Sequence, residues 1–485
     1  MPPQGARVVI GGAGLSGATL ARVHADAGHS VLVLERRDVV GGNCADAIDG
    51  NGIRVPLYGP HCFHTNDDDV WDFLGRFATW EPYEHRVIAC VPAHAPLASW
   101  APSHHDHHLP SLLERDTDDD DEGGDEGDEE GDEEGDGESW LPWQDGGAPA
   151  PASPSALTSP MLAMAPAVMT WEGRHVTFVP MPPCRPTINA LFGTSLRTDA
   201  ETEAWLARER RAPRHGGEPR NSEEVGLSRV GPRLYRMLFK NYSNKQWGRP
   251  LAEIGPHVLA RIPCRANDDT RYFADAHQAL PRDGYSALIG TMLDHPNIEV
   301  RCGVDFCAEQ HAVAQDGVVR YFTGRVDGYY AARGAPRLQY RTVTFRAETR
   351  DVATPAATLF PATQVNFPVP WADYTRITEP KHLLRQEAAD AVTTLLYEYA
   401  GDSVGMDDAF YPLDTEENRG LYARYKAMAG EEAGLTMVGR LAEYKYLNMD
   451  AAVANALAVA RDHAARMSPT GRAAEIETGA CPPTL

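Results

Sequence analysis

The sequence predicts an α/β fold in which one nucleotide-binding domain is assembled from discontinuous segments, with an inserted helical domain and an antiparallel β-sheet domain. Near the start, "ARVVIGG" is typical of a buried strand, and a glycine turn, the helical pattern "SGATLARVHADAGH" and a second strand, "SVLVLE", follow it. Near the end, "LTMVGRL" is again a strand with glycine, and the alanine-rich helix "DAAVANALAVARDHAARM" follows. The stretches between these two ends form the inserted domains.

The order of these patterns sets the expected domain boundaries. Helical spacing is clear in "RVGPRLYRMLFKNYSNKQW", and strands such as "VVRYFTG" and "LQYRTVTF" dominate after residue 298. The expected boundaries are 1–83 for the first part of the nucleotide-binding domain, 84–92 and 169–185 for strands of the sheet domain, 93–168 for an insertion, 186–257 for a helical substrate domain with a mobile loop, 258–310 for a strand and the return to the nucleotide-binding domain, 311–400 for the antiparallel sheet domain, and 401–485 for the last part of the nucleotide-binding domain.

The insertion at 93–168 carries most of the negative charge. The formal net charge is −24, and residues 114–138 contain 17 acidic residues and one arginine, which leaves −8 for the rest of the chain. This acidic tract has no apolar residue to bury and its flanks are rich in proline and alanine, so we expect it to be disordered. It is either a solubilising tether or a site that recruits a basic partner. The rest of the chain can still take an anionic substrate where arginines line the pocket, but no nucleic acid is expected as a partner.

Composition places the chain among globular proteins of the cytoplasm. Hydrophobic residues make up 42% of its 485 residues, and no apolar run approaches the roughly 20 residues of a membrane helix. The N-terminus has no long apolar stretch of the signal-peptide kind. The eight cysteines form no Cys-x-x-Cys pair, which favours free thiols in a reducing compartment.

The glycines of "GAGLSG" form a dinucleotide-binding fingerprint. Gly12, Gly14 and Gly17 follow a buried strand and open a helix, and Glu35 ends the next strand. Small residues let the backbone approach a pyrophosphate, the helix N-terminus supplies partial positive charge, and the carboxylate accepts hydrogen bonds from ribose hydroxyls. The pattern predicts a Rossmann-like domain that binds NAD or FAD.

A second glycine pair favours FAD over NAD. The stretch "RRDVVGGNC" places Gly41 and Gly42 just after Glu35, and this continuation resembles flavoproteins of the glutathione-reductase type. The nucleotide-binding domain is therefore expected to be a Rossmann-like FAD-binding domain.

The stretch "YGPHCFHT" raises the question of a metal site, because His61 and His64 flank Cys62. An extended segment that contains Gly-Pro does not place two side chains three apart on one face, as a helix would. We therefore expect no metal, and either a structural role or a place beside a cofactor for the two histidines.

Six motifs together resemble the UDP-galactopyranose mutase family. They are "GAGLSG", "GGN", "YGPHCFHT", "YSNKQWG", "YTRITE" and "VGRLAEYKYLNMD", in the family's order and spacing, and the resemblance covers nearly all of the chain outside the insertion. It implies an isomerase that interconverts UDP-galactopyranose and UDP-galactofuranose through a covalent adduct with N5 of reduced FAD, for galactofuranose biosynthesis. It also implies that the FAD must be reduced, with NADPH or NADH as an external reductant.

The resemblance also implies roles for individual residues. Arg261 and Arg376 match arginines that contact the pyrophosphate, and the implied catalytic residues are His61, Arg261, Arg376, Tyr446 and Asn448. The implied substrate-binding residues are Tyr242, Trp247, Tyr272 and Tyr411, with Tyr242 stacked on uracil and Trp247 near the sugar. The implied cofactor-binding residues are Gly12, Gly14, Ser16, Gly17, Glu35, Arg36, Gly42, Asn43, His61, Arg440, Met449 and Asp450. Asp450 is further expected to be the N-cap of a helix that points at the flavin, and Arg440 to contact the flavin phosphate region.

Two positions depart from the family pattern, and two other functions stay open. Asn448 stands where bacterial relatives have Asp, and Leu238 stands where a second aromatic residue is expected, which predicts a looser uridine pocket. A flavin amine oxidase-like oxidoreductase would share the fold but bind no UDP. A catalytically inert FAD- and UDP-binding protein would use the acidic insertion to recruit its partner. A homodimer is consistent with the family, although the sequence does not fix the oligomeric state.

Overall fold

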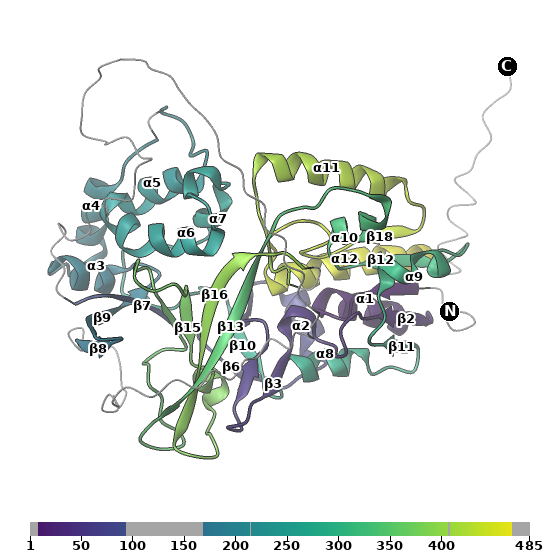
Figure 1. Cartoon of the computed structure of the whole chain (residues 1–485), viewed down its shortest axis with the longest axis horizontal. Coiled ribbons are helices and arrows are strands. Elements are labelled where there is room, and N and C mark those ends of the chain that lie inside the picture. The colour runs from purple at the N-terminus through teal and green to yellow at the C-terminus, as the bar shows by residue number, and fades with distance from the viewer. Residues whose placement is uncertain (1–7, 94–167, 214, 406–407, 468–485) are drawn as a thin grey trace, which may run out of the picture.

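The computed structural model of the 485-residue chain describes residues 8–93, 168–213, 215–405 and 408–467. Nearly all of the expected insertion at 93–168 therefore lies outside the described residues. The described chain builds a parallel sheet flanked by helices, a large mixed sheet and a helical region, which lie side by side (Figure 1). The predicted α/β class is confirmed.

The nucleotide-binding domain is built on a five-stranded parallel sheet. Its order is β11 (Ile298–Arg301), β2 (Val31–Leu34), β1 (Val8–Gly11), β12 (Val319–Phe322) and β18 (Leu435–Met437). β1 and β2 are buried along their whole length, as expected for parallel strands with both faces covered. Helix α1 (Leu15–Asp26) packs against α12 (Met449–Met467) and α8 (Tyr285–Leu293), so described segments from early and late in the sequence belong to one domain.

Two short strands lie outside the domains expected for them. β12 was expected in the antiparallel domain at 311–400, but it pairs in parallel with β1 and places Phe322 beside Gly11. A four-residue strand carries no signal for its sheet, because pairing depends on contacts far away in sequence. Likewise, β17 (Tyr411–Pro412) was expected in the nucleotide-binding domain and instead pairs with β13 (Tyr340–Asp351) of the second sheet.

The second sheet has eight strands and is mixed rather than purely antiparallel. Its order is β17, β13 (Tyr340–Asp351), β16 (Val392–Asp402), β15 (Arg376–Thr378), β14 (Gln364–Asn366), β7 (Val87–Pro92), β9 (Arg174–Met181) and β8 (Met169–Trp171). The single parallel pair, β14 with β7, joins segments that are separated by the helical region. All other pairs in this sheet are antiparallel.

The region expected to be helical is helical. It comprises α3 (Arg185–Phe192), α4 (Asp199–Glu209), α5 (Ser222–Leu234), a π-helical turn (Tyr235–Lys240), α6 (Asn241–Trp247), a 3₁₀ turn (Leu251–Glu253) and α7 (His257–Ala260). Leu238 and Phe239 lie in its core at 2% and 4% exposure. The departure at Leu238 therefore affects core packing.

Smaller elements connect these layers. The remaining strands are β3 (Asp46–Ile48), β4 (Arg54–Pro56), β5 (Phe63–Thr65), β6 (Trp80–Pro82) and β10 (His277–Pro281), of which β5, β10 and β6 form one sheet and β3 and β4 another. The remaining helices are α2 (Asp68–Gly75), α9 (Phe306–Val313), α10 (Val326–Tyr330) and α11 (Glu416–Glu431), with 3₁₀ turns at Gly42–Cys44, Ala331–Arg333 and Pro380–Arg385.

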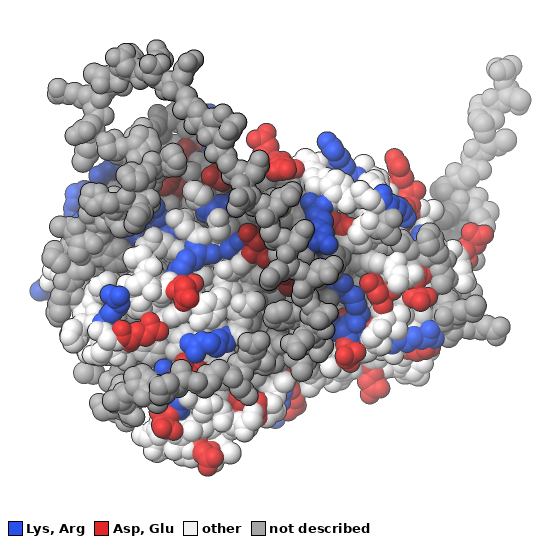
Figure 2. All heavy atoms as spheres, in the orientation of Figure 1, with Lys and Arg blue, Asp and Glu red and all other residues white. Residues whose placement is uncertain are grey.

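The described surface shows no broad field of one sign on the face drawn in Figure 2, where basic and acidic side chains are interspersed. Of the helices in the described ranges, none has the length and apolar character needed to cross a membrane. The seven cysteines in these ranges are all free, as expected from their spacing.

Candidate active site

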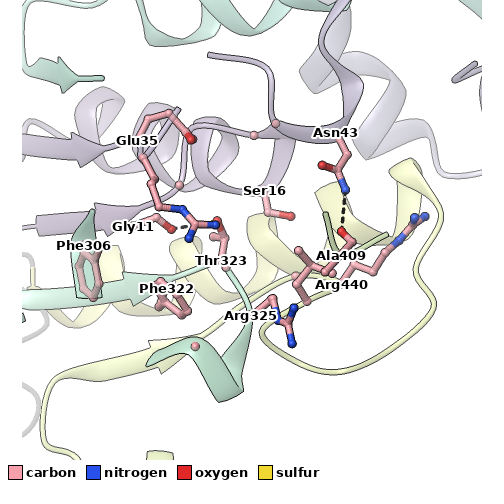
Figure 3. A pocket seen from close by; sticks show the side chains of 18 of the residues that line it. Gly11, Ser16, Glu35, Asn43, Phe306, Phe322, Thr323, Arg325, Ala409 and Arg440 are labelled. Carbon is pink, nitrogen blue, oxygen red and sulfur yellow. Dashed lines mark hydrogen bonds between the residues drawn. The ribbon is translucent and has the colours of Figure 1, made fainter. Parts of the chain in front are cut away.

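A cavity of about 550 Å³ lies at the carboxyl ends of β1, β2 and β12, where the strands of an open α/β sheet place a ligand. Glu35, Phe306 and Phe322 lie toward one end and Asn43, Ala409 and Arg440 toward the other, with Ser16 and Thr323 between them (Figure 3). Most of the residues expected to bind the cofactor line this cavity, namely Gly12, Gly14, Ser16, Glu35, Arg36, Gly42, Asn43, His61, Arg440 and Met449. Asn448, expected to be catalytic, lines it as well, whereas Gly17 and Asp450 do not.

The glycines of the two motifs pack on each other. A Cβ placed at Gly42, whose φ is +55°, would lie 2.8 Å from the Gly14 Cα. A Cβ at Gly17 would lie 1.9 Å from the Gly12 carbonyl oxygen, so Gly17 serves close packing of helix on strand. Side chains at these positions would displace the backbone that borders the cavity.

Glu35 is held in place by backbone donors. Its carboxylate is 7% exposed and accepts hydrogen bonds from the Ala13 N–H at 2.6 Å and the Arg37 N–H at 2.9 Å. A carboxylate offers about four acceptor positions, so capacity remains for ribose hydroxyls. The glycine cradle, this carboxylate and the volume of the cavity fit a dinucleotide such as FAD.

Several cavity residues were not found from the sequence, because they follow β12 or precede α9. Thr323 donates a hydrogen bond from Oγ1 to the Gly11 carbonyl at 2.9 Å. Arg325 is 4% exposed and forms a buried ion pair with Asp327 at 2.8 Å. With β12 assigned to the wrong domain, its carboxyl end could not be recognised as part of the site.

The end of the chain contributes a helix N-terminus. The Ala452 N–H donates to the Asn448 carbonyl at 3.0 Å, which makes Asn448 the N-cap of α12, and Asp450 lies in the first turn. The expected N-cap role of Asp450 is therefore wrong by two residues. Met449 lines the cavity, and its Sδ lies 3.8 Å from the Cys44 Sγ.

Arg440 connects the cavity to a cluster of arginines and tyrosines. Its guanidinium lies 4.9 Å from the ring centre of Tyr446 and 5.7 Å from that of Tyr411, and it donates to the Leu447 carbonyl at 2.9 Å through Nε. Tyr411 and Tyr446 are stacked, with centroids 5.7 Å apart and planes at 8°. Arg440 therefore lies between the cavity and the tyrosines.

Arg261 joins the same cluster from the end of α7. Its Nη1 donates to the Tyr446 hydroxyl at 2.9 Å, and its guanidinium lies 4.5 Å from that ring. The Arg261 side chain remains exposed, so it is accessible to an anion. Burial acts to raise the pKa of Tyr446, but Arg261, Arg440 and Arg376 outweigh it and lower the pKa of this phenol.

Arg376 enters the cluster from β15 and has a buried partner that was not found from the sequence. Its Nε donates to Glu398 Oε2 at 2.7 Å, and Glu398 is 0% exposed. Oε1 of Glu398 has no hydrogen-bond partner among the described residues. The sequence did contain a signal for this buried partner, because a carboxylate inside the apolar strand pattern "TLLYEYA" needs a cationic partner.

The expected substrate-binding aromatic residues lie around these arginines. Burial raises the pKa of Tyr242, while the nearby charge of Arg376 acts to lower it and that of Glu398 to raise it. Tyr272 packs edge-on against His85 at 5.7 Å. Trp247 is 5% exposed and its ring centre lies 6.2 Å from that of Tyr411. Trp247 thus belongs to the wall behind Tyr411.

The two histidines of "YGPHCFHT" have separate partners. His61 Nδ1 lies 2.8 Å from the Gly59 carbonyl, to which it must donate, and His64 Nδ1 lies 2.9 Å from Asp275 Oδ2. Burial and then the charge of Arg440 lower the pKa of His61 to about 4, so this ring is neutral near pH 7. Across the described ranges, no group of three or more His, Cys, Asp or Glu side chains could hold a metal ion.

Comparison with known proteins agrees with this geometry. A family model for UDP-galactopyranose mutase matches residues 237–446, which include all three arginines and all four tyrosines of the cluster, and one for an NAD(P)-binding Rossmann-like domain matches residues 10–77. A dTDP-fucopyranose mutase of Escherichia coli is 29% identical over 462 residues, covering 94% of this chain and 97% of the relative. A UDP-galactopyranose mutase of Mycoplasma pneumoniae is 28% identical over 475 residues, covering 93% and 94%.

A solved structure shares the overall fold. The crystal structure of a reduced UDP-galactopyranose mutase superposes with a TM-score of 0.57, covering 96% of each chain, at 13% sequence identity. At this identity the likeness establishes the fold alone.

Proposed function

We propose that this chain, which belongs to the UDP-galactopyranose mutase family, interconverts UDP-galactopyranose and UDP-galactofuranose with FAD as its cofactor. The observation that carries the proposal is the convergence of Arg261, Arg376 and Arg440 with a set of tyrosines directly beside the FAD cavity. Reduced FAD, when bound, supplies a nucleophile for the anomeric carbon. The residues of the chain then have to bind the nucleotide, orient the sugar and stabilise the charge of the leaving diphosphate.

The arginines perform the electrostatic part of this task. Arg261 is accessible and Arg376 is half-buried, so their guanidinium groups can pair with phosphate oxygens, for which a planar donor fork is well suited. Cations held in place before the reaction stabilise a departing phosphate without reorganisation in the transition state. Arg440 adds positive charge between the diphosphate and the cofactor cavity.

The tyrosines orient the ligand. Tyr446 accepts a hydrogen bond from Arg261, so its own O–H proton is left to donate to a phosphate or sugar oxygen. Tyr242 offers an aromatic face to the base, and Tyr272 and Tyr411 complete the wall around Arg376.

His61 lines the cofactor cavity, and its imidazole is a polar group that carries no charge at neutral pH. Because Nδ1 donates to the Gly59 carbonyl, Nε2 is an acceptor. A neutral imidazole adds no positive charge to a region that already holds Arg440 and Arg376.

One relative suggests a second candidate substrate for the same type of reaction. The Escherichia coli relative at 29% identity is a dTDP-fucopyranose mutase, so a thymidine-diphosphate sugar is the alternative substrate. The two candidates differ in the base methyl group, the ribose 2′-hydroxyl and the sugar 6-hydroxyl. Competition between UDP and dTDP for the FAD-loaded protein decides which nucleotide is preferred.

The proposal is tested by reducing the FAD-loaded protein with dithionite, supplying UDP-galactofuranose, and separating the products by chromatography. We expect UDP-galactopyranose from the reduced protein and none from the oxidised protein. Oxygen consumption with an amine and no UDP binding would indicate an oxidase instead. Binding of UDP without product would indicate an inert binding protein.

NADPH or NADH as reductant, a homodimer and a cytoplasmic location stay predictions from the sequence.

A further inference from the structure

Lys245 on α6 meets an unusual set of acceptors. Its ammonium donates to the carbonyls of Phe367, Val369, Ala372 and Tyr374. Three of these contacts are 2.7 to 2.8 Å, which matches the three N–H groups of an ammonium, and the contact to Val369 is longer at 3.3 Å. The acceptors span one loop, so a single side chain organises its backbone.

This loop, residues 367–375, connects β14 to β15. The four residues that accept from Lys245 are at most 3% exposed, and buried carbonyls without donors are costly. Arg376 follows the loop directly, and the Thr375 N–H is fixed to the Glu398 carbonyl at 2.8 Å. The loop that Lys245 holds in place therefore positions Arg376 in the site.

Helix α6 is itself held by a second buried cation, on β13. Arg341 on β13 is 3% exposed and donates to the carbonyls of Gln246 at 2.9 Å and Lys245 at 3.0 Å. These are carbonyls of the last turn of α6, where a cation is favourable. Tyr242 lies one turn before Lys245 on the same helix, so Lys245 joins the element that carries Tyr242 to the element that carries Arg376.

We propose that Lys245 is a positioning residue that fixes Arg376 opposite Tyr242 and so prepares the site for a nucleoside diphosphate. The identity of that ligand rests on the proposed function, but the role of Lys245 as a clamp does not. Lys245 does not have to touch the nucleotide, because its effect passes through the loop to Arg376.

The chain contains a matched control. Lys381 is 1% exposed and donates to the carbonyls of Ala357 and Val392, so it is also a buried lysine that satisfies backbone carbonyls next to the large sheet. None of these partners belongs to the arginine and tyrosine cluster. Lys381→Met should lower the melting temperature, as Lys245→Met should, but leave nucleotide binding unchanged.

The experiment measures UDP affinity of the full-length, FAD-loaded protein by calorimetry for Lys245→Met, Lys381→Met, Arg376→Ala and the double variant Lys245→Met/Arg376→Ala. We expect Lys245→Met to weaken UDP binding by about tenfold or more, and to weaken it by less than about threefold once Arg376 is already alanine. Additive losses, or an equal loss in Lys381→Met, would overturn the proposal. Lys245→Arg keeps the positive charge but not the compact ammonium geometry, so we expect a UDP affinity between those of the unmodified protein and Lys245→Met. If Lys245→Met does not fold, Lys245→Arg gives the same test.

Hydrogen exchange tests the clamp without reference to function. Amides of residues 367–378 should exchange faster in Lys245→Met, or in Lys245→Arg, than in Lys381→Met, and the flavin spectrum should be unchanged. If the unmodified protein binds no UDP, the proposed function fails while the exchange result still decides the role of Lys245. Unchanged exchange in this segment contradicts the proposal in either case.

Discussion

Glu398 determines how Arg376 presents its guanidinium to an anion. The carboxylate is fully buried and holds Nε of Arg376 at 2.7 Å, which leaves the other guanidinium nitrogens for a phosphate. An acid next to a phosphate-binding arginine opposes anion binding by its charge but favours it by orienting the donor. Because Arg376 has one buried anchor, we expect orientation to be the larger effect.

Variants of Glu398 separate these two effects. Glu398→Ala should weaken UDP binding by on the order of tenfold to a hundredfold, because the guanidinium loses its anchor, whereas Glu398→Gln keeps an acceptor and should retain most of the affinity. Glu348→Gln on β13 is the control, because Glu348 pairs with Arg350 at 2.6 Å away from the cluster. Calorimetric titration with UDP checks this, and an equal loss in both Glu398 variants would show that the charge itself is needed.

The contact between the two glycine motifs gives a second prediction at the scale of a residue. Gly42→Ala should yield protein that has lost most of its flavin, because the new Cβ would lie 2.8 Å from the Gly14 Cα at a φ of +55°. Gly50→Ala should keep its flavin, because, apart from its chain neighbours, no atom of the described residues lies within 4 Å of a Cβ placed at Gly50. Visible flavin absorbance per mole of purified protein is the measurement, and full flavin content in Gly42→Ala would contradict the predicted role.

At the scale of elements, the end of α6 determines the shape of the substrate side. Gly248 ends this helix with a φ of +63°, and a Cβ there would lie 2.5 Å from Nη1 of Arg341. Gly248→Ala should therefore displace α6 and weaken UDP binding, while the FAD cavity, which neither residue lines, keeps its flavin. UDP titration and flavin absorbance on the same sample test both parts.

Gly193 provides the control for this prediction. It ends α3 in the same left-handed conformation, with a φ of +61°, but within the described part of the chain no atom beyond its chain neighbours lies within 4 Å of a Cβ placed there. Gly193→Ala should cost only backbone strain, of about 1 kcal/mol, and leave UDP binding unchanged. Equal losses of UDP affinity in the two variants would mean that backbone strain, and not the clash with Arg341, is responsible.

The elements also show what could be predicted from the sequence. The fingerprint helix, the helical region and the arginines and tyrosines were found because local periodicity or motif resemblance marks them. β12 was misplaced and Thr323 and Arg325 were missed, because pairing between strands as distant in sequence as β1 and β12 leaves no local pattern. Glu398 was overlooked within a strand. Asp450 was expected as the N-cap, but Asn448, whose residue type also suits that position, holds it.

At the scale of the whole molecule, buried histidines tie stability to pH. Burial, together with His29 and His463, lowers the pKa of His24 to about 3, and burial lowers the pKa of His61 and of His85 to about 4. The three rings belong to different parts of the fold: His24 bonds Tyr321 in the nucleotide-binding domain, His61 borders the cofactor cavity, and His85 bonds Gln364 of the large sheet. Protonation of these histidines at low pH should therefore destabilise both the nucleotide-binding domain and the large sheet.

The sign of this effect follows from proton linkage. Between the unfolded pKa near 6.5 and the lowered folded values, the unfolded chain binds more protons, so stability is fully present above about pH 6.5 and is lost as the pH falls toward 4. We expect the melting temperature to fall steeply over this range, and His24→Gln to make the fall shallower. His175→Gln removes an exposed histidine and should leave the curve unchanged. Thermal unfolding followed by circular dichroism from pH 7 to about pH 4 tests this, and a flat profile would mean that the folded and unfolded chains bind the same number of protons, so that folding does not lower the pKa values of these histidines.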